Sequence, residues 1–259
     1  MQGLDNLRFI RQVFEEESIR HGLRGVLGVA AYEQVYETLL PVQQRRMEEL
    51  CGGELKGLIG SGSVISIAYA YPEHAIDAIA VPKGDDYDRD SWNIYAGWYR
   101  RLNRALDETA GRLADETGGV AIPATMTGVA GEVDHVEGYY VMVVSHRVAA
   151  ELSGVGWRGR NELIVNPVYG CAMRLASVVT GLPLERTETL DMNCGNCRAC
   201  LDVCTFLRFK DRLDNYREQC RRYIVHLDLD ADVCGKCVKA CYRDSIYRDT
   251  FQLRAVGFV

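Results

Sequence analysis

The sequence predicts an α+β protein made of two domains, residues 1–187 and residues 188–259. Apolar runs with helical spacing alternate with short β-branched runs up to about residue 185. After Pro183 the composition changes to cysteine, arginine and aspartate, and eight of the ten cysteines fall between residues 194 and 241. The contents of 47% hydrophobic and 25% charged residues are normal for a protein with a buried core.

The first half of the first domain predicts two helices and a buried strand. Apolar residues recur at helical spacing from Leu4 to His21, and Gly22 ends this helix. A second helix is expected over Val42 to Leu50. The run VISIAYAY, residues 64–71, is rich in β-branched and small apolar residues and is followed by Pro72, so it predicts a buried strand.

The second half of this domain predicts a long helix followed by three strands. Ser91 is the expected N-cap of the helix, and the glycine pair at 118–119 ends it. The run YYVMVVS, residues 139–145, predicts a strand, and Ser145 is the expected N-cap of a short helix after it. Two further apolar runs, ELIVNP and AMRLASVV, predict strands on either side of a turn at residues 169–170.

Charge and hydropathy exclude some broad classes of protein. The net charge of -6 gives no sign of a strongly basic, nucleic-acid-binding body. No apolar run reaches the roughly 18 to 20 residues that cross a bilayer, and the opening segment does not have the pattern of a signal peptide. We therefore expect a cytoplasmic protein without membrane attachment. Structural disulfides are not expected in a reducing cytosol, so the crowded cysteines indicate metal.

The first cysteine group has the spacing C-x2-C-x2-C-x3-C. Its members are Cys194, Cys197, Cys200 and Cys204. The first three thiolates converge on one 4Fe-4S cluster, while the fourth cysteine begins a helix that points at a second cluster. Zinc sites generally use two separated cysteine pairs, so this spacing favours iron and sulfur.

The second cysteine group, CGKCVKAC, repeats the pattern but lacks a local third ligand, which Cys220 is close enough in sequence to supply. A buried free thiol is the alternative for Cys220. In the crossed arrangement of two-cluster ferredoxins, each group lends its last cysteine to the other cluster. One predicted set is Cys194, Cys197, Cys200 and Cys241. The other predicted set is Cys204, Cys220, Cys234 and Cys237. Outside these sets, Cys51 and Cys171 are expected to be buried thiols.

The residues before and through the cysteine groups resemble the cobalamin-dependent epoxyqueuosine reductases. The family phrase G-L-G-W-x-G-K-N, an apolar strand, a Y-G or A-G turn and a second strand correspond to SGVGWRGRNELIVNPVYGCAMRLASVVTGLPLE, residues 153–185. The similarity extends to an isolated cysteine followed by a tyrosine, here Cys220 and Tyr223, and covers most of residues 60–245. Reductive dehalogenases have a similar arrangement, so the resemblance is to a superfamily.

This resemblance implies a nitroreductase-like α/β domain that binds a base-off cobalamin or other corrinoid, followed by a ferredoxin-like module with two 4Fe-4S clusters. It implies an oxidoreductase whose clusters pass electrons to cobalt. A small electron donor of the ferredoxin or flavodoxin type is the expected partner, and FMN is the less favoured cofactor. The alternative function is an electron-transfer or activator protein that reduces the corrinoid of a partner protein without turning over a substrate.

The turn GVGWRGRN is the predicted corrinoid site. Its glycines allow close backbone approach, and its arginines are fork-shaped hydrogen-bond donors. A loop that only shapes the domain junction is the alternative. The predicted contacts are Gly154, Gly156, Trp157, Arg158, Gly159, Arg160 and Asn161.

Two departures from the epoxyqueuosine reductases affect the expected chemistry. Tyr140 stands where that family has an aspartate proton donor, and a tyrosine is the proton donor in reductive dehalogenases, so the resemblance implies this role for Tyr140. A strand tyrosine that fills the core is the alternative. Only 18 residues follow Cys241, too few for the family's helical-repeat extension, and acids interrupt the basic stretch from Arg208 to Arg222. Action on transfer RNA is therefore expected to be doubtful.

Two weaker candidates precede the glycine-rich turn. His146 and Arg147 stand at the expected start of a helix, where backbone N–H groups can hold an anion, although a solvent-exposed position explains His146 equally well. Asp134 and His135 are placed to move protons, but a surface loop explains them as well.

Overall fold

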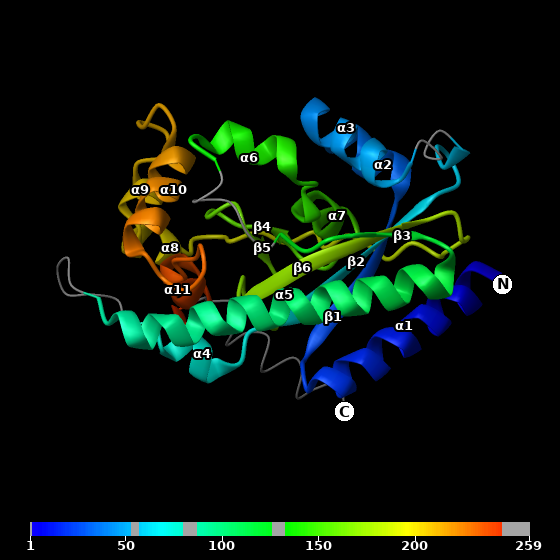
Figure 1. Cartoon of the computed structure of the whole chain (residues 1–259), viewed down its shortest axis with the longest axis horizontal. Coiled ribbons are helices and arrows are strands. Elements are labelled where there is room, and N and C mark those ends of the chain that lie inside the picture. The colour runs from blue at the N-terminus through cyan, green and yellow to red at the C-terminus, as the bar shows by residue number, and fades with distance from the viewer. Residues whose placement is uncertain (1, 53–56, 80–86, 126–132, 245–259) are drawn as a thin grey trace.

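A four-stranded antiparallel sheet lies at the centre of the computed structural model, which describes residues 2–52, 57–79, 87–125 and 133–244 (Figure 1). The strand order is β1-β2-β6-β3. The strands are β1 (Gly25–Ala31), β2 (Ser63–Ala70), β3 (Val120–Ile122) and β6 (Met173–Thr180). Every residue of β2 is buried, which explains its continuous apolar sequence in place of an alternating one.

Helices cover both faces of this sheet. On one face, α1 (Gln2–His21) and α5 (Arg89–Thr117) pack against alternate residues of β2, including Ile65 and Ile67. On the other face, Val64 contacts a second core formed with α2 (Tyr32–Thr38), α3 (Pro41–Leu50) and α7 (His146–Leu152). Because successive side chains of a strand point to opposite faces of the sheet, the residues of β2 contribute alternately to the two cores. No helix in the described ranges is long and apolar enough to cross a bilayer.

Most predicted elements are present, with one shifted cap. The helices expected at Leu4 to His21 and Val42 to Leu50 are confirmed, and Gly118 ends α5 with a positive φ of 59°. The expected N-cap Ser91 lies inside the first turn of α5. The actual cap is Asp88, whose carboxylate accepts hydrogen bonds from the Ser91 backbone N (3.3 Å) and hydroxyl (2.6 Å).

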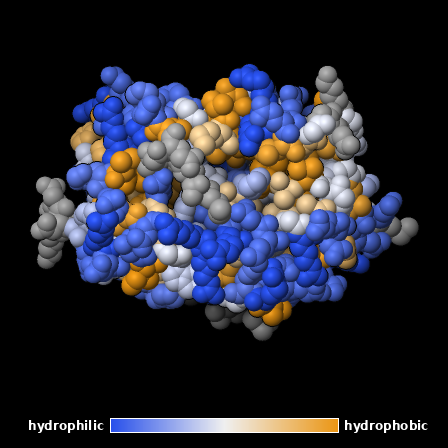
Figure 2. Space-filling view, viewed as in Figure 1, coloured by the Kyte–Doolittle hydropathy of each residue, from blue (hydrophilic) through white to orange (hydrophobic). Residues whose placement is uncertain are grey.

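The strand predicted at residues 139–145 is wrong, because Val136–Met142 form helix α6. The Glu218 carboxylate accepts a hydrogen bond from the backbone N of Val136 (2.9 Å), and Asn215 donates one to the Glu137 carboxylate (2.9 Å). These contacts with a distant helix override the strand preference of tyrosine and valine. Figure 2 shows hydrophobic side chains gathered near α6.

The cysteine-rich part forms four helices that pack on the end of α5. They are α8 (Ala199–Val203), α9 (Thr205–Arg208), α10 (Tyr216–Leu227) and α11 (Lys236–Asp244). Leu227, Val238 and Tyr242 belong to the same apolar core as Trp92 and Tyr95 of α5. The predicted boundary near residue 188 falls in the extended segment between β6 and α8. The division into two domains stays a prediction.

Short elements that the sequence did not predict complete the architecture. A two-stranded hairpin consists of β4 (Trp157–Arg158) and β5 (Ile164–Val165), and α4 (Glu73–Asp77) follows β2. Of the predicted strand ELIVNP, Ile164 and Val165 form β5, and Asn166 makes an isolated bridge to Gly170. This hairpin carries the glycine-rich turn toward the cysteine helices.

The main core generates a stability prediction for α5. Leu106 is fully buried, whereas Ile94 on the same helix is 48% exposed. We expect Leu106→Ala to lower the free energy of unfolding by about 2–5 kcal/mol because it leaves a cavity. Ile94→Ala should change it by less than about 0.5 kcal/mol. Urea unfolding followed by circular dichroism measures both variants, and equal effects would contradict the assignment of this core.

Candidate iron-sulfur centre and adjoining loop

Four cysteines from the two sequence groups line one small cavity between the hairpin and the cysteine helices. They are Cys194, Cys197, Cys200 and Cys241. Cys241 lies on α11, whereas the other three precede or begin α8, so the first group is joined by a thiol from the second. This is the set that the crossed arrangement predicts for the first cluster. Val165, Arg160 and Asn161 complete the lining.

The remaining four cysteines also lie near one another. Burial, together with the nearby thiols of Cys234 and Cys204, raises the pKa of Cys220 to about 12. The pKa of Cys237 is raised by burial and then by the thiols of Cys234, Cys220, Cys204 and Cys200. Charge interactions weaken with distance, so the four remaining thiols lie near one another, and Cys200 of the first set adjoins them. Across the described residues, no set of three or more His, Cys, Asp or Glu side chains is arranged to hold a single metal ion.

The glycines of the GVGWRGRN turn allow chain segments to cross closely. Gly154 has a φ of +69°, and a Cβ there would lie 1.9 Å from the Glu188 carbonyl oxygen. A Cβ on Gly156 would lie 2.4 Å from the Val165 carbonyl oxygen across the hairpin. Gly159 closes the hairpin by donating its N–H to the Leu163 carbonyl (2.8 Å). These positions require glycine because of packing within the chain.

The polar residues of this turn also have partners within the chain. Arg158 forms a two-pronged contact with the Glu151 carboxylate (3.0 and 2.8 Å), and Trp157 is buried in the core. Arg160 donates to the Gly195 carbonyl (2.7 Å), which fixes the turn to the first cysteine group. Asn161, 7% exposed, lines the cysteine cavity. The turn therefore borders the predicted cluster, and its contact with a corrinoid stays a prediction.

Tyr140 lies on α6 beside a group of cations. Arg217 of α10 donates to the Tyr140 hydroxyl oxygen (3.2 Å). Arg147 donates to the Glu162 carbonyl (2.7 Å), and burial together with Arg158 and Arg217 lowers the pKa of its guanidinium. The alternative of a strand tyrosine in the core is wrong, because Tyr140 is half-buried and on a helix. Its role as a proton donor stays a prediction.

Glu162 and Glu218 were not singled out in the sequence, although they hold this region together. Glu162 has a positive φ of 64°, and its carboxylate pairs with Lys210 (3.1 Å). Glu218 accepts hydrogen bonds from Arg221 (2.8 Å), which lowers the pKa of its carboxyl to about 2. Neither role has a local sequence signal, since each depends on residues brought together by folding.

Most of the basic stretch from Arg208 to Arg222 is engaged within the chain. Arg221 donates to the carbonyls of Val133 (2.9 Å) and Asp134 (2.6 Å), and Arg208 donates to the Leu201 carbonyl (3.2 Å). The solvated helix face expected for this stretch is therefore only partly present. Arg222 belongs to it, since its side chain is 61% exposed.

His146 is buried and does not stand at a solvent-facing anion site. One ring nitrogen lies 3.0 Å from the Ser177 hydroxyl and the other 2.8 Å from the Pro123 carbonyl. Burial lowers the pKa of its imidazole from 6.5 to about 4. His135 is exposed and precedes α6 as its N-cap residue.

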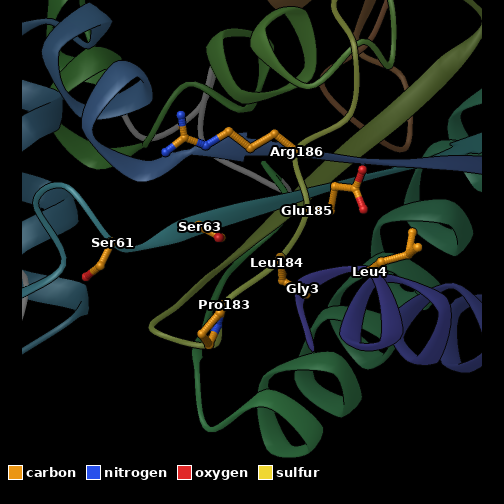
Figure 3. Close-up of a pocket in the computed structure, with 8 residues that line it drawn as sticks. All are labelled: Gly3, Leu4, Ser61, Ser63, Pro183, Leu184, Glu185 and Arg186. Atoms are coloured by element: carbon orange, nitrogen blue, oxygen red, sulfur yellow. The ribbon is translucent and has the colours of Figure 1, made fainter. Parts of the chain in front are cut away.

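A separate, open cavity of about 430 Å³ lies where the start of α1 meets the segment after β6 (Figure 3). Its lining is Gly3, Leu4, Ser61, Ser63, Pro183, Leu184, Glu185 and Arg186. Asn6 donates to the Pro183 carbonyl (2.8 Å), and the Glu185 N–H donates to the Gly3 carbonyl (3.1 Å). No sequence motif points to this cavity, and we assign it no chemistry.

Comparison with known proteins supports the resemblance found in the sequence. No family model matches the chain. The epoxyqueuosine reductase of Listeria monocytogenes is 31% identical over 145 residues, which are 55% of this chain and 34% of that protein. The epoxyqueuosine reductase of Bacillus anthracis is 27% identical over 150 residues, which are 57% of this chain and 36% of that protein. The chain thus spans about a third of these curated relatives.

Solved structures share the fold. The epoxyqueuosine reductase of Streptococcus thermophilus has a TM-score of 0.50 and 18% identity, and the match covers 93% of this chain and 66% of that one. A catabolic reductive dehalogenase in complex with 3-bromo-4-hydroxybenzoic acid has a TM-score of 0.51 and 21% identity, over 74% of this chain and 27% of that one. The chain is thus similar in sequence to epoxyqueuosine reductases over just over half of its length, and its fold is similar to those of an epoxyqueuosine reductase and a reductive dehalogenase.

The expectation that action on transfer RNA is doubtful is wrong. The curated relatives that this chain resembles are epoxyqueuosine reductases, which act on transfer RNA, so this similarity contradicts the expectation. The expectation failed because net charge describes the whole molecule and the interspersed acids describe one basic stretch, and neither excludes an RNA contact elsewhere on the surface.

The buried His146 generates a pH prediction. Between about pH 6.5 and 4 the unfolded chain binds a proton at this position that the folded chain does not, so stability falls as the pH falls. His146→Gln should lower the melting temperature at about pH 7.5, where hydrogen bonds are lost, but should reduce the further decline down to about pH 5. His135→Gln is the exposed control. An unchanged pH slope in His146→Gln would contradict the assignment.

Proposed function

We propose that the chain is an iron-sulfur, corrinoid-dependent reductase, in which two 4Fe-4S clusters pass single electrons to a base-off cobalamin or related corrinoid held by residues 1–187. The observation that carries this proposal is the crossed grouping of thiols, in which Cys241 lines the cavity of the first cysteine group. Sequence similarity to epoxyqueuosine reductases supports oxidoreductase activity. A cytoplasmic location is part of the proposal.

The donor sets fit two clusters. Each set supplies four thiols, the number that a 4Fe-4S cluster requires. The thiols of the first set line one cavity, and the apolar side chain of Val165 also lines it. The clusters supply single-electron transfer, and the chain fixes their ligands and excludes water. Cys204 follows α8 directly and belongs to the second set, while Cys200 on α8 belongs to the first, so this short helix would hold both clusters close together.

The face around Tyr140 has groups that suit a corrinoid. Such a cofactor has a broad apolar ring, amide side chains and a phosphate, and so requires an apolar surface with a few polar donors. Val141 and Met142, next to Tyr140 on α6, are 55% and 42% exposed. Arg217 and the half-buried Arg147 supply positive charge at the same place. Exposed apolar residues beside donors mark binding surfaces in soluble proteins.

Tyr140 is the proposed proton donor. Its hydroxyl oxygen accepts a hydrogen bond from the Arg217 guanidinium (3.2 Å), which orients the hydroxyl and leaves its O–H group as a donor toward a bound substrate. Arg217 also donates to the Tyr216 hydroxyl oxygen (3.2 Å). Substitution of Tyr216 therefore serves as the control for substitution of Tyr140, because both hydroxyls contact the same guanidinium.

Metal analysis tests the clusters. Protein purified without oxygen should contain about eight iron atoms per chain, and Cys220→Ala should lower this to about four because one ligand set is broken. Cys51→Ala, which removes a buried thiol from the second core, should keep the full content. Colourless protein, zinc in place of iron, or full iron in Cys220→Ala would each refute the crossed assignment.

Cobalamin binding tests the corrinoid site. We expect protein with intact clusters to bind hydroxocobalamin and to give a base-off absorption spectrum. Arg217→Leu should weaken binding several-fold because it removes positive charge from the proposed face, while Arg101→Leu on α5 leaves that face unchanged. Copurified FMN without any cobalamin binding would favour a flavin and contradict the corrinoid.

Turnover tests Tyr140. With chemically reduced, cobalamin-loaded protein and either 3-bromo-4-hydroxybenzoic acid or an epoxyqueuosine-modified stem loop as the probe, Tyr140→Phe should reduce the rate at least about 100-fold, the usual contribution of a general acid. Tyr216→Phe should retain most of the rate. Equal rates in wild type and Tyr140→Phe would exclude the proton-donor role. Base-off binding without turnover of either probe would favour the activator function.

A further inference from the structure

Cys171 is a buried thiol outside both ligand sets, yet it lies directly behind one ligand of the first set. It begins the approach to β6 and is 3% exposed. Its Sγ lies 3.9 Å from the Cys237 carbonyl oxygen, one turn before Cys241 on α11, and its thiol forms a hydrogen bond with the Cys241 side chain. A free thiol is thus in contact with a proposed cluster ligand.

The neighbours of Cys171 set the direction of that hydrogen bond. Asn161 donates from its side-chain amide to the Cys171 Sγ (3.2 Å), and its own amide oxygen accepts from the Leu163 backbone N (3.2 Å). The amide orientation is therefore fixed, and the Cys171 sulfur already serves as an acceptor. The S–H group remains as the donor, and α11 offers it two acceptors, the Cys237 carbonyl oxygen at 3.9 Å and the Cys241 side chain.

The backbone beside Cys171 permits this close approach. Gly170 has a positive φ of 56°, and a Cβ at this position would lie 3.4 Å from the Cys241 Sγ. The turn is closed by reciprocal hydrogen bonds between Gly170 and Asn166 (2.8 and 2.9 Å). A tight turn thus brings Cys171 against Cys241.

We propose that Cys171 is a positioning residue that donates an S–H hydrogen bond to the Cys241 sulfur and thereby raises the reduction potential of the cluster held by the first set. Asn161 holds the thiol in the donating orientation. The inference rests on the proposed clusters. Reduction adds negative charge that spreads onto the thiolate ligands, so a donor to one ligand stabilises the reduced cluster more than the oxidised one.

Redox titration followed by electron paramagnetic resonance tests this inference, because the second cluster is an internal reference in the same molecule. In Cys171→Ala, we expect the equilibrium constant for reduction of the first cluster to fall about tenfold, which is about 59 mV for one electron. The second cluster should keep its potential, and the iron content should stay at the wild-type value. Cys51→Ala, the other buried free thiol, should shift neither cluster.

Two further variants keep the inference testable if Cys171→Ala does not fold. Cys171→Ser retains a donor and should shift the first cluster less than alanine does. Asn161→Ala leaves the thiol in place without its orienting partner and should shift the same cluster in the same direction by a smaller amount.

Two results would overturn the inference while the clusters stand. The first is unchanged potentials in the Cys171 and Asn161 variants. The second is loss of about half of the iron in Cys171→Ala, since this would make Cys171 a ligand. Wild-type protein without any cluster signal would instead refute the proposed function, and this is measured before any variant.

Discussion

The packing of α11 against α8 is the constraint on which the candidate site depends. These two helices carry or adjoin thiols of both sequence groups, and only their contact brings Cys241 to Cys194 and its neighbours. The body of the protein holds α11 in place. Tyr242 donates to the Glu73 carboxylate (2.8 Å), and Gly235, with a φ of +78°, lets the chain pass Ile79 and Tyr95, which a Cβ would approach to 2.4 and 2.9 Å.

The glycine-rich turn is the second junction between the two parts of the chain. Arg160 contacts the carbonyl of Gly195, and Glu162 pairs with Lys210, so two adjacent stretches of the turn hold the cysteine helices from the opposite side. Both junctions consist of specific polar contacts around an apolar core that the two parts share. The cysteine helices are therefore fixed relative to the sheet, as electron transfer between separate cofactor sites requires.

Sequence patterns predicted the elements whose cause is local. The β-branched runs of β2 and β6 and the glycine after α5 are signals of this kind. Strand β1 was missed because Gly25 and Gly28 weaken strand propensity, and both are required by tertiary contact, since a Cβ would lie 2.1 Å from the Ala68 carbonyl and 2.2 Å from that of Ser153. Spacing predicted that Cys241 joins the first cysteine group, and these four thiols line one cavity. The pairing of Tyr140 with Arg217 depends instead on a helix that the sequence misassigned.

The docking of α11 also affects how the chain closes around the proposed cofactors. About forty residues separate Cys200 from Cys241, and closing a flexible loop of that length carries an entropic cost that grows with the logarithm of its length. The packing of α11 against α8 offsets part of that cost. Helix packing, and not cofactor binding alone, would then hold the two ends of this loop together.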